Sequence, residues 1–350
     1  MKKALVTGAA GFIGSNVVKL LLEDGVDVRA MVLPGEDLRN LSGVDVEKVE
    51  GNVLDSPSID SALHGCDTLF HLAAIFSIFS KDRSIFYEVN LQGSRNVLWA
   101  ARRAELEKIV YTSSIAAIGL EPGTQPASES TAFNQFDGAS DYVLTKYLSQ
   151  QEALTFAREG MPIVVVNPAF PYGEGDVAPT PTGKIILDVA NGLEFVSYEG
   201  GINIVDVKDV ARGHILAASR GRVGEKYILG NRNISITELF EMVVRTVGLD
   251  IRIVKMPVSV AKLYGYLWEK WAGISGHQPT TTATEVSYSS KYLYVDISKA
   301  RTELGYEPAP VEESMERAIE WFKREGYIPR TGPAVWLMTS LGRLSRRLPG

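Results

Sequence analysis

Three spaced glycines follow the first apolar segment of this 350-residue chain. Ala4-Leu5-Val6 leads into Thr7-Gly8-Ala9-Ala10-Gly11-Phe12-Ile13-Gly14, and a helix-like pattern begins at Phe12. Glycines at this spacing permit a tight turn, a close approach of the backbone to a ligand, and close packing of a helix on a strand. The backbone amides of the helix start then face a phosphate. The same spacing also occurs in strand-to-helix turns that bind nothing, so the choice depends on the rest of the chain.

Short apolar runs alternate with helix-compatible stretches through the first half, which is typical of a parallel sheet covered on both faces. We expect an α/β fold, a Rossmann doubly wound parallel sheet over residues 1–167, followed by a smaller C-terminal substrate-binding region over 168–330. This region returns to the sheet at about 203–218, and later helices are expected around Thr237 to Thr246 and Glu312 to Gly326. The expected strands are Lys3 to Val6, Val28 to Val32, Val44 to Val49, Thr68 to Leu72, Lys108 to Thr112 and Ile163 to Val166.

The composition argues against several classes of function. A formal charge of −6 without a basic cluster does not favour nucleic acid. No run approaches the roughly 18 apolar residues of a membrane span. The one cysteine, Cys66, cannot form an internal disulfide, so we expect a cytoplasmic protein. His71 has no second histidine or carboxylate at metal-ligand spacing, so no metal is expected.

The C-terminal segment 331–350 is basic and amphipathic. Its leucines share one helical stripe, Leu337, Leu341, Leu344 and Leu348, whereas its arginines lie largely elsewhere. One interpretation is peripheral contact of this tail with anionic lipid. The alternative is docking on its own domain or on a partner subunit, as in a homodimer, or a frayed end.

Tyr142 and Lys146 stand four residues apart, which places both on one face of a helix. A lysine charge beside a phenol stabilises the phenolate and lowers the pKa of the tyrosine toward neutrality, which suits proton exchange with an alcohol or a carbonyl oxygen. A packed ring and a solvated amine at the same spacing would explain the pair equally simply. Further motifs are needed to decide.

Five motifs in order provide that decision. They are the glycine turn, His71-Leu72-Ala73-Ala74, Asn90 in Val89-Asn90-Leu91-Gln92-Gly93, Tyr111-Thr112-Ser113-Ser114, and Tyr142-x-x-x-Lys146. Their order and spacing resemble the extended short-chain dehydrogenases/reductases, from residue 1 to about residue 327. Within that superfamily the chain looks most similar to the dihydroflavonol 4-reductase-like group, which includes hopanoid-associated sugar epimerase-type proteins. Ala178 to Gly183 and Gly201 to Ala211 strengthen this resemblance.

The resemblance implies roles for individual residues. Tyr142 is the expected general acid/base, Lys146 tunes it and binds the nicotinamide ribose, Ser114 holds the substrate oxygen with Ser113 as the alternative, and Asn90 supports the proton path. The cofactor-binding set comprises Thr7, Gly8, Gly11, Phe12, Ile13, Gly14, Leu33, Arg39, Asn52, Val53, Leu72, Ala73, Ala74, Thr112, Tyr142, Lys146, Asn167 and Pro168. The substrate set comprises Ser114, Ile75, Phe76, Phe170 and Tyr172.

The choice between NAD and NADP depends on the end of the second strand. No acid directly follows Val32, which favours NADP over NAD, with Arg39 as a partner for the 2′-phosphate. A solvated arginine is an equally simple interpretation of Arg39. Two departures from the family pattern weaken the inference: Leu33 stands where many NADP-preferring relatives carry arginine, and Asn52 where relatives carry an aspartate that reaches the adenine.

Two reactions remain open, and both act on a small-molecule substrate. The first is hydride transfer between a ketone and a secondary alcohol on a medium-sized apolar or aromatic substrate, because Ile75-Phe76-Ser77-Ile78-Phe79 is unusually apolar for a loop over a site. The second is epimerisation of a nucleotide sugar. Ile202 stands where such epimerases carry an arginine for the diphosphate, which favours the first reaction. A third alternative is an inactive sensor or scaffold that binds NADP, against which the intact Ser/Tyr/Lys set argues.

Overall fold

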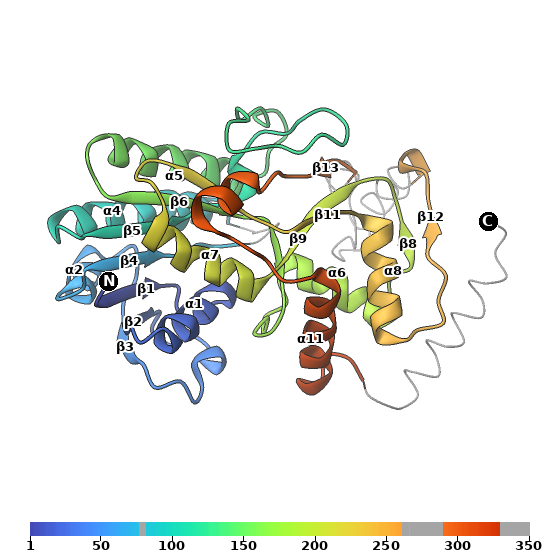
Figure 1. The fold of residues 1–350 in the computed structure, drawn as a ribbon, viewed down its shortest axis with the longest axis horizontal. Helices are drawn as coiled ribbons and strands as arrows, with labels where there is room; N and C mark the ends of the chain where they lie inside the picture. The colour runs from blue at the N-terminus through green and yellow to red at the C-terminus, as the bar shows by residue number, and fades with distance from the viewer. Residues whose placement is uncertain (77–81, 261–265, 267–289, 330–350) are drawn as a thin grey trace.

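The computed structural model describes residues 1–76, 82–260, 266 and 290–329. Seven parallel strands form the main sheet in the order β10-β6-β5-β4-β1-β2-β3 (Figure 1). The strand order reverses at β1, where β1 lies between β2 and β4, and ligands of doubly wound sheets bind outside such a switch point. The expected α/β doubly wound fold is therefore confirmed. The strands are β1 (Lys3–Thr7), β2 (Asp27–Val32), β3 (Glu47–Glu50), β4 (Thr68–His71), β5 (Lys108–Thr112), β6 (Ile163–Pro168) and β10 (Lys226–Leu229).

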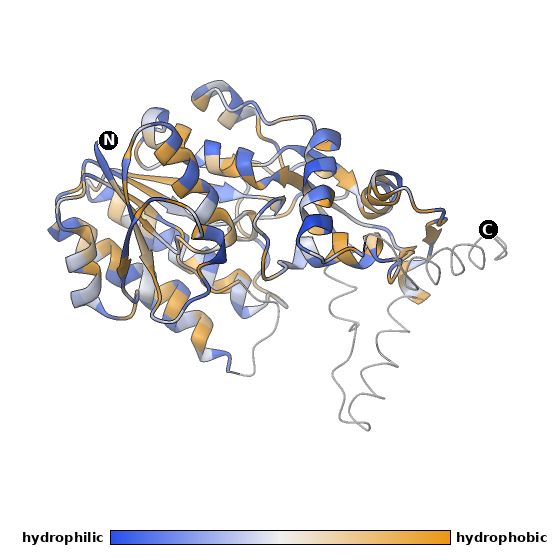
Figure 2. Ribbon diagram, turned by 90° about the horizontal axis from the view of Figure 1, so that it is seen from below, coloured by the Kyte–Doolittle hydropathy of each residue, from blue (hydrophilic) through white to orange (hydrophobic). Residues whose placement is uncertain are grey.

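Helices cover both faces of this sheet. On one face α1 (Phe12–Glu23) packs against α7 (Val207–Arg220), and on the other α2 (Ser56–Leu63), α4 (Ser94–Arg103) and α5 (Asp141–Arg158) share a second core. Figure 2 shows the strands as a largely apolar layer within this sandwich. Burial on both faces explains why the strands are nearly continuous apolar runs in the sequence.

The smaller region lies beside the carboxyl ends of the main strands (Figure 1). Its sheet has the order β11-β9-β13, and β7 also pairs with β9, while β8 and β12 form a separate pair. The strands are β7 (Phe170–Tyr172), β8 (Val196–Ser197), β9 (Gly201–Asp206), β11 (Arg232–Ser235), β12 (Val254–Lys255) and β13 (Tyr292–Leu293). The helices are α6 (Pro181–Ala190), α8 (Ile236–Val247) and α11 (Val311–Arg324), which share an apolar cluster with β9. Short helical turns are η1 (Arg39–Leu41), α3 (Ser84–Phe86), η2 (Tyr87–Gly93), η3 (Ile115–Ala117) and η4 (Ala300–Leu304).

The two regions are interleaved in sequence. The return expected at 203–218 begins in β9 of the small sheet, continues through α7 on the main sheet, and extends to β10 at the edge of that sheet. The main sheet thus contains a strand from beyond residue 167. The strand expected over Val44 to Val49 is observed only as Glu47–Glu50, because the backbone at Val44 turns back to bond Leu41 and pairing with β2 begins at Glu47.

None of the described helices is long and apolar enough to cross a membrane. The predicted amphipathic tail, 331–350, lies outside the described residues, so its lipid or subunit contact stays a prediction. Ser77 to Phe79 of the apolar loop also lie outside the described residues, so their position over the site stays a prediction.

The glycine turn is the tightest packing point between β1 and α1. A Cβ atom at Gly14 would lie 2.1 Å from the backbone oxygen of Gly8. Gly8 has a φ of +66°, and a Cβ there would lie 2.9 Å from the backbone of Ala73. Because the opposing atoms are backbone, no side-chain rotation relieves either clash. These glycines therefore fix both the turn and its distance from the end of β4.

We predict that Gly14→Ala separates α1 from the turn and lowers the free energy of unfolding by about 3 kcal/mol, at the upper end of the cost of overpacking. The matched comparison is Gly51→Ala, whose Cβ would meet the flexible end of the Met31 side chain at 2.6 Å. Urea denaturation of both variants measures the difference. Equal losses of stability in the two variants would contradict this account of the turn.

Candidate functional site

A cavity of about 1110 Å³ lies at the carboxyl edge of the main sheet and extends to the smaller region. Its volume slightly exceeds the roughly 300–1,000 Å³ of sites for one small ligand. The cavity therefore has room for a cofactor together with a substrate. It is lined by most of the residues predicted from sequence, namely Thr7, Gly8, Gly11, Phe12, Ile13, Gly14, Leu33, Asn52, Val53, Leu72, Ala73, Ala74, Ile75, Phe76, Thr112, Ser114, Tyr142, Lys146, Pro168 and Phe170.

The floor of the cavity fits a dinucleotide. The N-cap of α1 is Gly11, whose residue type supplies no capping side chain, so the amides of the first turn are open to an anion. The hydroxyl of Thr7 accepts hydrogen bonds from the amides of Leu72 and Ala73, both at 3.2 Å. That hydroxyl ties the end of β1 to the end of β4, which places the small Ala73 and Ala74 beside the glycine turn.

His71 supports this floor from below. Its Nδ1 lies 2.8 Å from the Thr7 hydroxyl, and its Nε2 lies 3.1 Å from the hydroxyl of Ser94. Burial, with a smaller effect from the charge of Lys146, lowers the pKa of His71 to about 3, so the ring is neutral. Over the described residues, no three metal-ligating side chains gather into a cluster. His71 is a structural residue of the cofactor floor.

The expected catalytic residues reach the cavity from two elements. Ser114 follows β5, and its hydroxyl accepts a 3.1 Å hydrogen bond from the amide of Ala116. Both serines line the cavity, but Ser113 is buried whereas Ser114 is partly exposed, which makes Ser114 the more accessible of the two. Tyr142 and Lys146 lie in the first turns of α5, which begins after the Ser140 cap. The ring of Phe76 contacts the ring of Tyr142, with centroids 4.9 Å apart.

Lys146 is the deeply buried cation of the site. Its Nζ donates a 2.9 Å hydrogen bond to the backbone carbonyl of Thr112 at the end of β5. Desolvation lowers its pKa to about 8. Its charge is therefore present at neutral pH and sensitive to mild alkali. The only other charged side chain among the described lining residues is Glu36, which lies at the other end of the cavity.

Three predicted site residues lie behind the cavity wall. Asn90 bonds the backbone of Ile75 through both polar atoms of its side-chain amide, at 2.7 and 3.1 Å, so it holds the wall and does not line the cavity. Asn167 is fully buried and donates to the carbonyl of Ser114 at 2.7 Å. Tyr172 is fully buried, and its hydroxyl donates to the carbonyl of Val311. In sequence, their spacing alone does not reveal on which side of the wall they lie.

The end of β2 differs from expectation. Arg39 does not line the cavity: its Nε forms an ion pair with Asp37 at 2.7 Å, and its Nη2 lies 3.5 Å from the carbonyl of Val177. Glu36 lines the cavity and accepts a 2.9 Å hydrogen bond from the amide of Leu33. Sequence reasoning missed Glu36 because it looked for an acid directly after the strand. The loop through Pro34 and Gly35 brings this later acid back.

Other lining residues carried no clear signal in the sequence. The smaller region contributes Leu293, Tyr294 and Val295 to the far wall, and Gln135 contributes a polar group beside them. Leu293 to Val295 reach the site because β13 pairs with β9 and because Val295 bridges to Ala127, and Gln135 is held by the carbonyl of Ile118. Such contacts between distant segments leave no local pattern.

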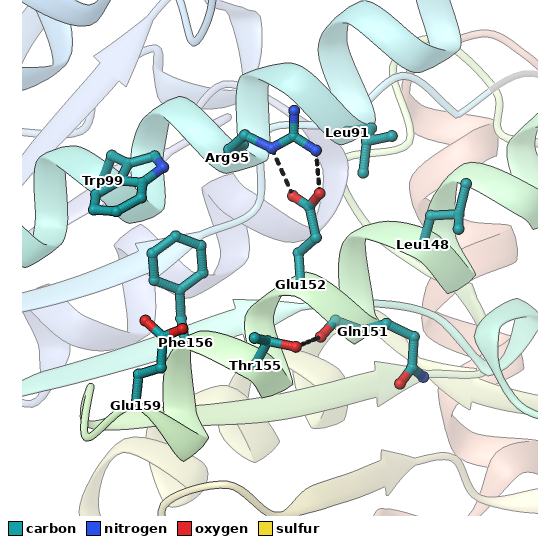
Figure 3. Close-up of a pocket in the computed structure, with 9 residues that line it drawn as sticks. All are labelled: Leu91, Arg95, Trp99, Leu148, Gln151, Glu152, Thr155, Phe156 and Glu159. Carbon is teal, nitrogen blue, oxygen red and sulfur yellow. Dashed lines mark hydrogen bonds and ion pairs between the residues drawn. The ribbon is translucent and has the colours of Figure 1, made fainter.

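A second hollow lies between α4 and α5, two helices that cover one face of the main sheet (Figure 3). Its polar centre is the Arg95–Glu152 ion pair, and the rings of Trp99 and Phe156 pack edge to face at its base. Glu152 neutralises the cation of Arg95, the second carboxylate, Glu159, pairs with Arg102, and none of the predicted catalytic residues lines the hollow. It is therefore separate from the candidate site.

Comparison with known proteins agrees with this architecture. Residues 4–230 match the model of the NAD dependent epimerase/dehydratase family. A chain from Synechocystis sp., provisionally named a dihydroflavonol 4-reductase, is 38% identical over 92% of this chain and 95% of its own length. Sterol demethylase protein B of Methylococcus capsulatus is 32% identical over 93% of this chain and 99% of its own. The crystal structure of gox2253 superposes with a TM-score of 0.84 at 39% identity, covering 94% of this chain and all of that one.

Proposed function

The chain belongs to the NAD dependent epimerase/dehydratase family, and from that premise we propose that it interconverts a ketone and a secondary alcohol by hydride transfer. The observation that carries the proposal is one apolar cavity that joins the glycine turn to Ser114, Tyr142 and Lys146. A bound nicotinamide cofactor supplies or accepts the hydride. The protein itself binds the substrate oxygen and transfers the proton.

Each of the three catalytic side chains has a separate role in these steps. The hydroxyl of Ser114 holds the substrate oxygen, and the hydroxyl of Tyr142 donates a proton to it during reduction. During oxidation the same tyrosine accepts the proton as its phenolate. The charge of Lys146 stabilises that phenolate, and this interaction is strong because the lysine is desolvated. Phe76 packs against the tyrosine ring and shields it from water.

The lining supports an uncharged, medium-sized apolar substrate. The substrate end of the cavity is bordered by Ile75, Phe76, Leu120, Phe170 and Leu293. Among the described lining residues the cation is Lys146, which the catalytic role already engages. A nucleotide sugar needs a partner for its diphosphate, and an unpaired diphosphate in an apolar cavity is costly. Epimerisation of a nucleotide sugar is therefore the second candidate, favoured by the family membership alone.

The ribose end of the cavity supports NAD(H) over NADP(H), which revises the preference expected from sequence. Glu36 faces the cavity as a carboxylate that would repel a 2′-phosphate and accept a hydrogen bond from a 2′-hydroxyl. Arg39, the expected phosphate partner, is bound to Asp37. Leu33 adds no charge at the same edge.

We predict that Tyr142→Phe lowers kcat by about 10³-fold, within the usual contribution of general acid–base catalysis, and leaves the Kd for the cofactor nearly unchanged. The matched control is Tyr147→Phe on the same helix, because Tyr147 stacks on Phe133 outside the cavity. Assays with apolar ketones and with nucleotide sugars, each with NADH and NADPH, identify the reaction. Full turnover by Tyr142→Phe would refute the assignment, and sugar interconversion without net cofactor use would favour the epimerase.

We predict that ketone reduction slows as the pH rises through about 8. Lys146 is charged below this pH and neutral above it, so its support of the tyrosine is lost in alkali. Lys146→Arg keeps the charge to a much higher pH and is expected to move the fall in rate upward. The measurement is kcat for reduction from pH 6.5 to 10. A rate that stays constant through pH 9.5 in the wild-type enzyme would contradict this role of the lysine.

We predict that NADH binds at least about tenfold more tightly than NADPH, equivalent to roughly 1.4 kcal/mol. Glu36→Gln removes the repelling charge and is expected to narrow this ratio mainly by strengthening NADPH binding. Asp45→Asn, a surface carboxylate outside the lining, serves as the control for net charge. Calorimetric titration measures each Kd. If NADPH binds more tightly than NADH, and Arg39→Ala abolishes that difference, the preference for NADP expected from sequence would be correct.

A further inference from the structure

Thr112 links the two helical layers of the fold at the catalytic edge. Its backbone carbonyl accepts the 2.9 Å hydrogen bond from Lys146, which belongs to α5 on one face of the main sheet. Its hydroxyl lies 3.0 Å from Nε2 of His214, which belongs to α7 on the opposite face. One residue at the end of β5 therefore has a partner on each side of the sheet.

The alternation of side chains along β5 explains this arrangement. Ile109 and Tyr111 enter the core shared with α4 and α5, and the Tyr111 hydroxyl donates to Ser94 of α4. Val110 enters the core shared with α1 and α7. Successive side chains of a strand point to opposite faces, so Thr112 points toward α7 like Val110. Its carbonyl lies at the end of the strand, where Lys146 reaches it.

The hydrogen bonds of His214 fix the direction of the link. Nδ1 of this ring lies 2.8 Å from the carbonyl of Val210, and a carbonyl only accepts, so Nδ1 carries the hydrogen. His214 is fully buried, and burial lowers its pKa to about 4, so the ring is neutral and Nε2 is an acceptor. The hydroxyl of Thr112 therefore donates to His214.

We propose that His214 is a positioning residue for the catalytic lysine, acting through Thr112. The imidazole holds the Thr112 hydroxyl, the rigid end of β5 holds the Thr112 carbonyl, and that carbonyl anchors the ammonium group of Lys146 beside Tyr142. This inference rests on the proposed function, because it assigns a role to Lys146 in proton transfer. His214 itself does not line the cavity, so its effect reaches the reaction only through the strand.

The consequence is that the position of Lys146 depends on a contact on the far side of the sheet. Buried lysine side chains have several rotatable bonds, and one fixed acceptor selects among their positions. Misplacement of a catalytic group by about 1 Å costs up to about 10²-fold in rate. Loss of the link is therefore expected to lower kcat and to raise the pH at which alcohol oxidation reaches half of its maximum, because the phenolate then has less support. The KM for substrate is expected to change little.

The first test compares two substitutions at Thr112. Thr112→Val keeps the shape and removes the hydroxyl, and it is expected to lower kcat about tenfold or more. Thr112→Ser keeps the hydroxyl and is expected to recover most of that loss. Thr155→Val on α5 is the matched control, because its hydroxyl bonds Gln151 outside the cavity (Figure 3). Equal kcat and equal pH profiles for Thr112→Val and wild type would overturn the proposal.

The second test removes the partner and leaves the cavity lining unchanged. His214→Phe keeps a ring and removes the acceptor, whereas His214→Gln retains one. We expect the pH profile of His214→Phe to move with that of Thr112→Val, and the double variant to be no slower than the slower single variant, since both changes break one link. Multiplicative losses in the double variant, in enzyme that remains folded by circular dichroism, would show that the two residues act separately and would overturn the proposal.

Tyr142→Phe separates a failure of this inference from a failure of the proposed function. If Tyr142→Phe is inactive while the Thr112 and His214 variants match wild type, the reaction assignment stands and the positioning role is wrong. If Tyr142→Phe retains full activity, the assignment of the site itself is wrong. If Thr112→Val or His214→Phe fails to fold, Thr112→Ser or His214→Gln is measured in its place. The proposal requires that the pH profile of that conservative variant match the profile of wild type.

Discussion

Parallel pairing of the seven main strands is the constraint on which the site depends. Because every strand runs in the same direction, the segments that follow β1, β4, β5 and β6 all emerge at one edge of the sheet. The glycine turn, the small Ala73 and Ala74, the serine pair and Pro168 are far apart in sequence and meet at this edge. The close contact of Gly14 with Gly8 then brings the start of α1, with its open amides, to the same place.

Neutral polar side chains connect the elements around this edge. Thr7 and His71 join β1 to β4, and Thr112 and His214 join β5 to α7. In both histidines burial lowers the pKa well below neutrality, so each neutral ring presents one donor and one acceptor, and at His214 the Val210 carbonyl fixes Nδ1 as the donor. A buried polar group without a partner is costly, so a satisfied pair of this kind holds its two elements in a single arrangement. These two pairs therefore keep the ends of β1, β4 and β5 in fixed relative positions.

Much of the fold and of the catalytic edge could be predicted from the sequence, because local rules govern them. Alternating apolar runs predicted the parallel sheet, and the glycine turn and the Tyr142–Lys146 spacing report geometry within a few residues. The differences between expectation and structure concern distant contacts. Arg39 was expected at the ribose, but Asp37, two residues away, binds it, and a loop brings Glu36 to the cavity instead. Tyr172, expected at the substrate, and Asn90, expected to support the proton path, bond backbone and do not line the cavity, and their roles stay predictions.

The apolar lining of the cavity connects substrate selection with the acid–base chemistry. The same burial that makes a charged substrate costly also lowers the pKa of Lys146 to about 8. A more polar cavity would admit more water, return the lysine toward its ordinary pKa and weaken its interaction with a phenolate, since electrostatic interactions weaken as the local dielectric rises. In the reaction that we propose, an uncharged substrate that fills the cavity excludes water from Lys146 and Tyr142. In that reaction the exclusion of water strengthens the interaction of a charged Lys146 with the phenolate, provided that the pH stays below the pKa of the lysine and that Thr112 and His214 keep it in place.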